Sequence, residues 1–193
     1  MRFLVTKTGY SLFAVSSAFQ KSIRRGLEED AIYWAIEMYP KFEAYLWRRI
    51  KIISSEDIGL AEPNISANIS ALYQLYKEQK EYSKKENEKP SERIFIVHAV
   101  LLLARAKKSR IVDHVQCYFF RNHGTEKREV PDYALDKHTI QGKAKGRGFE
   151  HFFTEGAKLN NMADLEHEQK YFDLAKDILL QEEMKVDENT ELF

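Results

Sequence analysis

The sequence predicts an all-α fold, a single helical domain with a long glycine-rich loop late in the chain. Apolar residues recur three and four positions apart between residues 30 and 119, which is the spacing of helices with a buried face. Prolines and glycines lie at the ends of these apolar segments, where helices stop. The chain has 193 residues, 44% of them hydrophobic and 12% aromatic, which is enough to build a packed core.

The first predicted helices lie on either side of Pro40. Asp30 can cap a helix whose apolar residues share one face until Pro40 ends it. A second helix keeps the same spacing from Phe42 to Gly59, a plausible C-terminal stop. A long helix follows and fades into a charged run over residues 77–89, which we interpret as solvated.

The middle of the chain supplies the predicted core helix. Residues 94–106 are apolar nearly all round, as expected of a helix that is buried on every side. Ser109 can cap the next helix, which breaks at Gly124. Glycines and Pro131 then displace regular spacing over residues 124–161, which predicts an ordered loop.

These assignments divide the chain into five predicted segments. They are an N-terminal extension over 1–15 that reads like a native beginning, a helical core over 16–123, the basic and glycine-rich loop over 124–161, a C-terminal helix over 162–186 and a frayed tail over 187–193.

The charge balance and the cysteine content limit the expected partners and location. Thirty Lys and Arg residues stand against thirty Asp and Glu residues, so no global field attracts nucleic acid, and any DNA contact must come from a local patch. The single cysteine, Cys117, excludes an intramolecular disulfide and lies in an apolar run, which predicts a buried, inert thiol. No apolar run has the length of a signal peptide or a membrane span, so we expect a cytoplasmic protein without a membrane partner.

Four ordered segments of the chain resemble one known family. They are Ser17 to Gly26, Ala31 to Trp34, Arg48 to Pro63 with its Ser-Glu-Asp-Ile-Gly-Leu-Ala stretch, and Leu103 to Ser109. In this order and at this spacing they resemble the C-terminal region of the replication-associated recombination protein A family of AAA+ ATPases. This family is also called RarA or MgsA, and the Werner helicase-interacting protein is its eukaryotic relative. The resemblance covers roughly residues 16–159.

The resemblance implies a helical domain like the collar of a clamp loader. In the family this domain follows the ATPase core and mediates assembly of a homotetramer, and the ATPase acts at stalled replication forks and DNA junctions. The chain itself has no Walker A phosphate loop and no Walker B strand ending in an Asp-Glu pair. The glycines between 142 and 148 are not followed by the required Gly-Lys-Ser/Thr. We therefore expect no ATPase activity and no cofactor.

Two groups of residues are candidates for subunit or DNA contacts. Lys21, Arg24 and Arg25 lie on about one helical turn, so they could grip phosphates, pair across a subunit interface with Glu56 and Asp57, or form a solvated face. The second group, Arg48 and Arg49, lies in the third similar segment and is a candidate for the same contacts.

The adjacent carboxylates Glu56 and Asp57 could be an acid and base pair or magnesium ligands. Neighbouring residues on a helix point about 100° apart, so we favour a structural role in which one forms a local salt bridge and the other faces solvent.

The late loop carries the remaining candidates. Lys143, Lys145 and Arg147 form a basic tract that we interpret as a DNA-phosphate contact. His138 and His151, with Asp136 and Glu155, are the only His and carboxylate group in the loop, and their spacing matches no compact zinc signature. A metal or hydrolytic site at these two histidines is therefore the weaker alternative.

Two functional classes follow. The first is a non-catalytic module that forms a homo-oligomer, with an AAA+ ATPase encoded elsewhere and DNA as candidate partners, and that supports replication, recombination or repair. The second is a small DNA-associated enzyme or metal-binding protein that uses the loop from His138 to Glu155.

Overall fold

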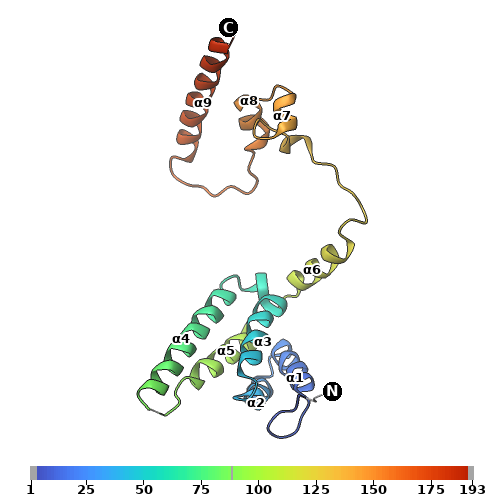
Figure 1. Cartoon of the computed structure of the whole chain (residues 1–193), viewed down its shortest axis with the longest axis vertical. Coiled ribbons are helices and arrows are strands. Elements are labelled where there is room, and N and C mark those ends of the chain that lie inside the picture. The colour runs from blue at the N-terminus through green and yellow to red at the C-terminus, as the bar shows by residue number, and fades with distance from the viewer. Residues whose placement is uncertain (1–3, 88, 191–193) are drawn as a thin grey trace. The chain divides into compact units, whose positions relative to one another are not determined.

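The structure, a computed structural model, describes residues 4–87 and 89–190, which form helices joined by loops (Figure 1). The α-helices are α1 (Leu12–Arg25), α2 (Glu28–Met38), α3 (Glu43–Ile53), α4 (Ile65–Lys85), α5 (Arg93–Arg105), α6 (Ile111–Asn122), α7 (Ile140–Ala144), α8 (Phe149–His151) and α9 (Glu168–Thr190). Within these described ranges extended pairing is limited to isolated bridges, such as that between Val5 and Ser11, and no residue belongs to a β-strand. The predicted all-α class is confirmed.

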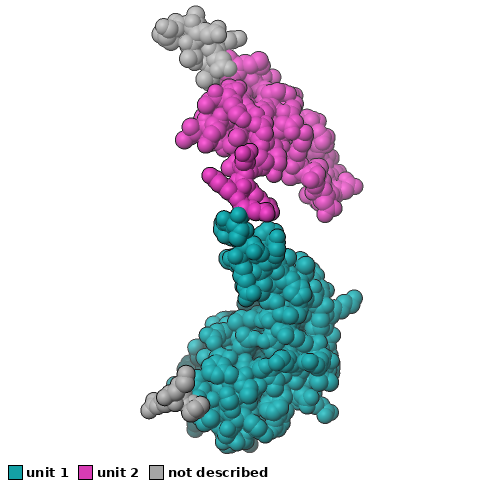
Figure 2. Space-filling model, turned by 90° about the vertical axis from the view of Figure 1, so that its right-hand side faces the viewer, with its two compact units in different colours: residues 1–125 teal, residues 126–193 magenta. Residues whose placement is uncertain are grey.

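The chain forms two compact units rather than the single domain that the sequence predicts (Figure 2). Unit 1 comprises residues 1–125 and unit 2 comprises residues 126–193. The division falls at the start of the predicted loop, next to Gly124, whose φ of 89° lies in the left-handed region. A change of chain direction at this glycine is therefore easy, and regular helix ends before it at Asn122.

The core of unit 1 lies among α1 to α5. Its largest fully buried side chains include Trp47, Tyr76, Phe19, Met38 and Leu103. The Trp47 ring lies 5.1 Å from the rings of both Tyr73 and Tyr76, centroid to centroid, so aromatic contacts join α3 to α4. Leu12 and Val15 are also buried, so α1 begins inside the segment that the sequence assigned to an extension over 1–15.

Helix α5 packs against α1, α2 and α4, but it is not buried on every side as its composition predicted. Ile96, Ala99 and Leu103 lie in the core, whereas Ile94 and Val97 are exposed. Hydrophobic composition therefore identified a core helix correctly but overestimated how much of it the neighbouring helices cover.

The helix predicted from Phe42 to Gly59 changes its geometry before it ends. It is α-helical to Ile53 and continues as a π-helical segment, η1 (Ser54–Ile58), followed by the 3-10 turn η2 (Gly59–Ala61). Gly59 has a φ of 46°, and a Cβ atom there would lie 2.9 Å from a methyl carbon of Val112. Glycine is required here because both the left-handed backbone and the close approach of α6 exclude a side chain.

Unit 2 contains more helix than the predicted loop. Residues 124–161 include α7, α8, the 3-10 turn η3 (Asp132–Ala134) and the π-helical segment η4 (Phe152–Gly156). Helix α9 begins at Glu168, later than the predicted start at 162, and continues to Thr190. The predicted tail over 187–193 is thus helical up to Thr190, and its last three residues lie outside the described residues.

A substitution in the core of unit 1 tests the helix packing directly. We expect Ile50→Ala to lower the free energy of unfolding by about 3 kcal/mol, because Ile50 is fully buried and its removal leaves a cavity. The matched control Ile36→Ala removes the same atoms from a residue that is 59% exposed, so it should cost less than about 1 kcal/mol. Urea unfolding followed by circular dichroism measures both. Equal losses at the two positions would contradict the helix packing described above.

Candidate functional site

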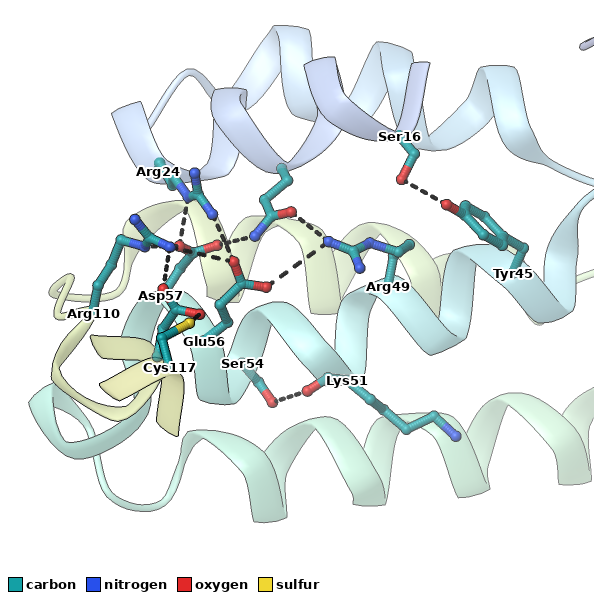
Figure 3. A network of polar contacts seen from close by, with 12 residues as sticks. Ser16, Arg24, Tyr45, Arg49, Lys51, Ser54, Glu56, Asp57, Arg110 and Cys117 are labelled. Atoms are coloured by element: carbon teal, nitrogen blue, oxygen red, sulfur yellow. Dashed lines mark hydrogen bonds and ion pairs between the residues drawn. The ribbon is translucent and has the colours of Figure 1, made fainter. Parts of the chain in front are cut away.

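A cluster of charged side chains joins four parts of unit 1 (Figure 3). The C-terminal half of α1 supplies Arg24, α3 supplies Arg49, η1 supplies Glu56 and Asp57, and the residue before α6 supplies Arg110. We call this cluster the arginine–carboxylate network. It contains four of the seven residues that the sequence proposed for subunit or DNA contacts.

Asp57 is the central residue of the network and is completely buried. Its Oδ2 accepts a hydrogen bond of 2.7 Å from the side-chain amide of Gln20, and its Oδ1 accepts one of 2.5 Å from Nε of Arg24. Nε of Arg110 lies 3.4 Å from the same Oδ1 as an ion pair. The backbone carbonyl of Asp57 accepts the N–H of Ser109 at 3.0 Å, so this residue holds both α1 and the chain that leads into α6.

Glu56 is also surrounded by arginines. Its Oε1 lies 2.8 Å from Nη2 of Arg24 and 3.6 Å from Nη2 of Arg110, and its Oε2 lies 4.0 Å from Nη2 of Arg49. The expectation that one of the two adjacent carboxylates faces solvent is therefore wrong. Arginines approach the π-helical segment from three separate parts of the chain, so both of its adjacent carboxylates can form ion pairs.

The three cationic residues of α1 differ in whether they belong to the network. Arg24 is bound within its own chain to Glu56 and Asp57, so these contacts need no second subunit. Lys21 donates to Oγ of Ser17 and Arg25 donates to the carbonyl of Lys21, and both of these cations remain exposed.

The two arginines of α3 differ in the same way. Arg49 donates a hydrogen bond to the side-chain oxygen of Gln20 and belongs to the network. Arg48 is exposed, and its guanidinium carbon lies 4.9 Å from the centre of the Tyr45 ring.

The network is arranged to hold helices together. Each carboxylate is in contact with at least two arginines, and Arg110 also binds Asp113 in the first turn of α6. These contacts connect α1, α3, η1 and the start of α6.

The basic tract of the late loop is largely paired with an acidic residue of its own unit. Lys145 lies 2.9 Å and Arg147 lies 2.6 Å from the carboxylate of Asp132. Arg147 also donates to the backbone carbonyls of Asp132 and Leu135, so it closes the loop. Lys143 is exposed on α7.

The histidines of the alternative site have other contacts. The His138 ring packs edge-on against Phe152 at 5.3 Å, and its backbone N–H donates to Asp136. Nδ1 of His151 is buried and has no hydrogen-bond partner among the described atoms. Across residues 4–87 and 89–190, no group of three or more His, Cys, Asp or Glu side chains is placed to hold a metal ion. The loop therefore offers no cluster of donors for the metal alternative.

Two features of unit 1 were not anticipated from the sequence. No residue of α6 is buried, and Cys117, predicted to be a buried thiol, is only half-buried, with its Sγ 3.8 Å from a carboxylate oxygen of Asp113. A cavity also lies between α3, α4 and α6. Apolar spacing over 111–119 predicted the amphipathic helix but could not show that nothing covers it.

The fold is therefore that of an all-helical protein in which the Ser-Glu-Asp-Ile-Gly-Leu-Ala segment carries a buried acidic residue. The family described as MgsA AAA+ ATPase C terminal matches residues 27–190, and the chain belongs to this family. The matched range contains Arg48 to Pro63 and Leu103 to Ser109. The first similar segment, Ser17 to Gly26, lies outside it.

A curated relative is similar over much of the same region. Replication-associated recombination protein A of Haemophilus influenzae is 27% identical over 134 residues. The alignment covers 68% of this chain, and the chain spans 27% of the relative's length.

No helix within the described residues is both long enough and apolar enough to cross a membrane.

The buried position of Asp57 predicts a large effect of losing its charge. Asp57→Asn should lower the free energy of unfolding by about 2 kcal/mol, because Arg24 and Arg110 lose a charged acceptor whose side chain is fully buried. The isosteric control Glu56→Gln should cost about 1 kcal/mol, since the Glu56 side chain is partly exposed. Chemical denaturation measures both values. A smaller loss for Asp57→Asn than for Glu56→Gln would contradict the central role of Asp57.

The contacts of Asp132 predict an unusual titration. Hydrogen bonds from Lys145 and then Arg147 lower the pKa of Asp132 from 3.8 to about 2. Because the folded pKa lies below the unfolded one, the contribution of these ion pairs is complete above about pH 4 and is lost as the pH falls through 2. A carboxyl-detected NMR titration should therefore show Asp132 still ionised at about pH 3. Lys145→Gln should raise this pKa towards the value measured in urea, and an unchanged value would refute the pairing.

Proposed function

We propose that this chain is a non-catalytic assembly module that supports DNA replication or recombination. The proposal is supported by its membership of the MgsA AAA+ ATPase C-terminal family and by the name of its relative, replication-associated recombination protein A. A module of this kind contributes contacts to copies of itself and to an AAA+ ATPase, while the motor domain supplies nucleotide hydrolysis.

The surface of α6 is the observation that carries the proposal. This amphipathic helix of twelve residues has no buried residue, although half of its length is apolar or aromatic. The exposed apolar side chains of α6 are Ile111, Val112, Val115, Tyr118, Phe119 and Phe120. An apolar face that remains uncovered in a single chain is typical of a surface that another protein covers.

The lack of a buried apolar core in unit 2 also supports the proposal of an assembly module. Among its described residues only Gly142 is buried, so no apolar side chain there is fully removed from water. Helix α9 exposes Tyr171, Leu174 and Ile178 at helical spacing. A unit of this size without a buried apolar cluster gains little hydrophobic stabilisation by itself, so a contact with a partner surface would stabilise it.

The exposed cations are the candidates for DNA contacts. Lys21, Arg25, Arg48 and Lys143 reach solvent, whereas Arg24 and Arg49 are engaged in the arginine–carboxylate network. Because the chain has no net charge, a few exposed cations would give a weak and salt-dependent contact with phosphates. Within the proposal, DNA is a secondary partner and self-association is the principal activity.

The apolar face of α6 provides the test. We expect Phe119→Glu to raise the dissociation constant for self-association at least tenfold, because Phe119 is 50% exposed and the change places a charge in an apolar contact. Size-exclusion chromatography with light scattering, performed over a concentration series, measures this constant.

Two variants serve as controls for that experiment. Leu75→Glu alters an exposed apolar residue on α4, and Arg25→Glu reverses an exposed cation on α1. Both should leave the assembly unchanged if α6 is the interface. A monomeric wild-type chain at all concentrations would refute self-association, and disruption by Arg25→Glu alone would move the interface to α1.

A further inference from the structure

The cavity of about 450 Å³ between α3, α4 and α6 has the size of a small-molecule site. Its wall contains Trp47, Arg48, Lys51 and Ile52 from α3, Tyr73 from α4 and Val112 from α6. All of these residues belong to unit 1. The cavity therefore combines apolar and aromatic walls with two cationic side chains, which is the composition of a site for an anionic ligand with an apolar part.

The charges around the cavity leave an excess of positive charge. Glu56 and Asp113 also line it, but both are bound by arginines of the network. No carboxylate in the described part of the chain forms an ion pair with Arg48 or Lys51. An anion that enters the cavity would meet two cations whose charge is not neutralised within the chain.

An aromatic contact holds one of these two cations, Lys51, at the cavity. The ammonium of Lys51 lies 3.6 Å from the centre of the Tyr73 ring, and that of Lys77 lies 5.1 Å from the same ring. Figure 3 shows the side chain of Lys51 leaving α3 away from the arginine–carboxylate network. Tyr73 thus positions a cation that would otherwise move freely in solvent.

Trp47 adds a hydrogen-bond donor without a partner. Its side chain lines the cavity and is 1% exposed, and no described atom accepts a hydrogen bond from its Nε1. Because this side chain belongs to the cavity wall, its indole N–H is a local reporter for a ligand that enters the cavity.

From these contacts we propose that the cavity binds a phosphate monoester attached to a planar ring, a ligand of the size of a mononucleotide. Arg48 and Lys51 bind the phosphate, and the apolar wall formed by Ile52 and Val112 contacts the ring. Phosphate fits the donors better than a cation or a neutral ligand would, because the acidic groups of the wall are already paired. The two cations that bind the phosphate come from α3 rather than from α6, so the binding test is read separately from the test of self-association, although Val112 of α6 belongs to both surfaces.

Deoxyadenosine monophosphate is a suitable probe, and Trp47 is a suitable reporter. The chain contains two tryptophans, so its NMR spectrum should show two indole N–H signals, and Trp47→Phe assigns them. We expect the Trp47 signal to move saturably with the nucleotide. The signal of Trp34, which packs against Tyr10 and Tyr33, should stay in place.

Charge and volume variants test the two halves of the site. Arg48→Gln and Lys51→Gln should each weaken binding about tenfold, because each removes one charged contact with the phosphate. Ala44→Trp, at an exposed residue of the cavity wall, should abolish binding by filling the space without a change in charge. Lys84→Gln, on the last turn of α4, is the matched control and should bind as the wild type does. Circular dichroism shows whether each variant is folded.

Two sources of the ligand can be separated by further titrations. A signal that moves with free nucleotide identifies a small-molecule site, and one that moves only with a 5′-phosphorylated oligonucleotide identifies a DNA end. An equal response to a 5′-hydroxyl oligonucleotide would overturn the proposed monoester site. No response of Trp47 to any of the three, or equal weakening by Lys84→Gln and Lys51→Gln, would also overturn it, whatever the oligomeric state of the chain.

Discussion

The buried carboxylate of Asp57 is the constraint on which the arrangement of unit 1 depends. A fully buried charge is costly unless opposite charges and hydrogen-bond donors surround it. The Asp57 carboxylate accepts hydrogen bonds from Gln20 and Arg24 of α1 and forms an ion pair with Arg110. The backbone carbonyl of Asp57 accepts the N–H of Ser109, just before α6. The segments that supply these groups are distant in sequence, so satisfying one carboxylate brings the first helix, the π-helical segment and the start of the sixth helix together.

The way in which α6 is attached follows from this constraint. Arg110 and Asp113 fix the beginning of α6 through charge, and Gly59 allows Val112 to approach closely. None of its side chains is buried, so α6 is held at one end and presents apolar residues to solvent. A helix held by polar contacts at its start is free to use its apolar surface for a partner, which is the basis of the proposed assembly role.

The network also changes the assignment of charged residues to functions. Two of the arginines that the sequence suggested for phosphate or subunit contacts form ion pairs with carboxylates of the same chain. The cations without such ion pairs lie elsewhere. They include Arg48 and Lys51 beside the cavity and isolated exposed residues such as Lys21 and Arg25. For a chain with no net charge, this distribution favours a small, local anion site over a broad DNA-binding surface.

The sequence by itself determined the all-α class, the family, and many of the helix ends in unit 1. Pro40 acts locally, since a proline blocks helix continuation and α2 ends at Met38. The expected cap at Asp30 is wrong, because α2 already begins at Glu28, and Asn64 precedes α4 without a side-chain capping hydrogen bond. Only the tertiary structure decided that Arg24 pairs within the chain, that both Glu56 and Asp57 are matched, that Cys117 is half-buried and that the chain divides into two units. The physical reason is that apolar spacing shows which face of a helix can be buried, but not which neighbour covers it. Likewise, the charge of a residue shows that it needs a partner, whereas the identity of that partner depends on segments that only the fold brings together.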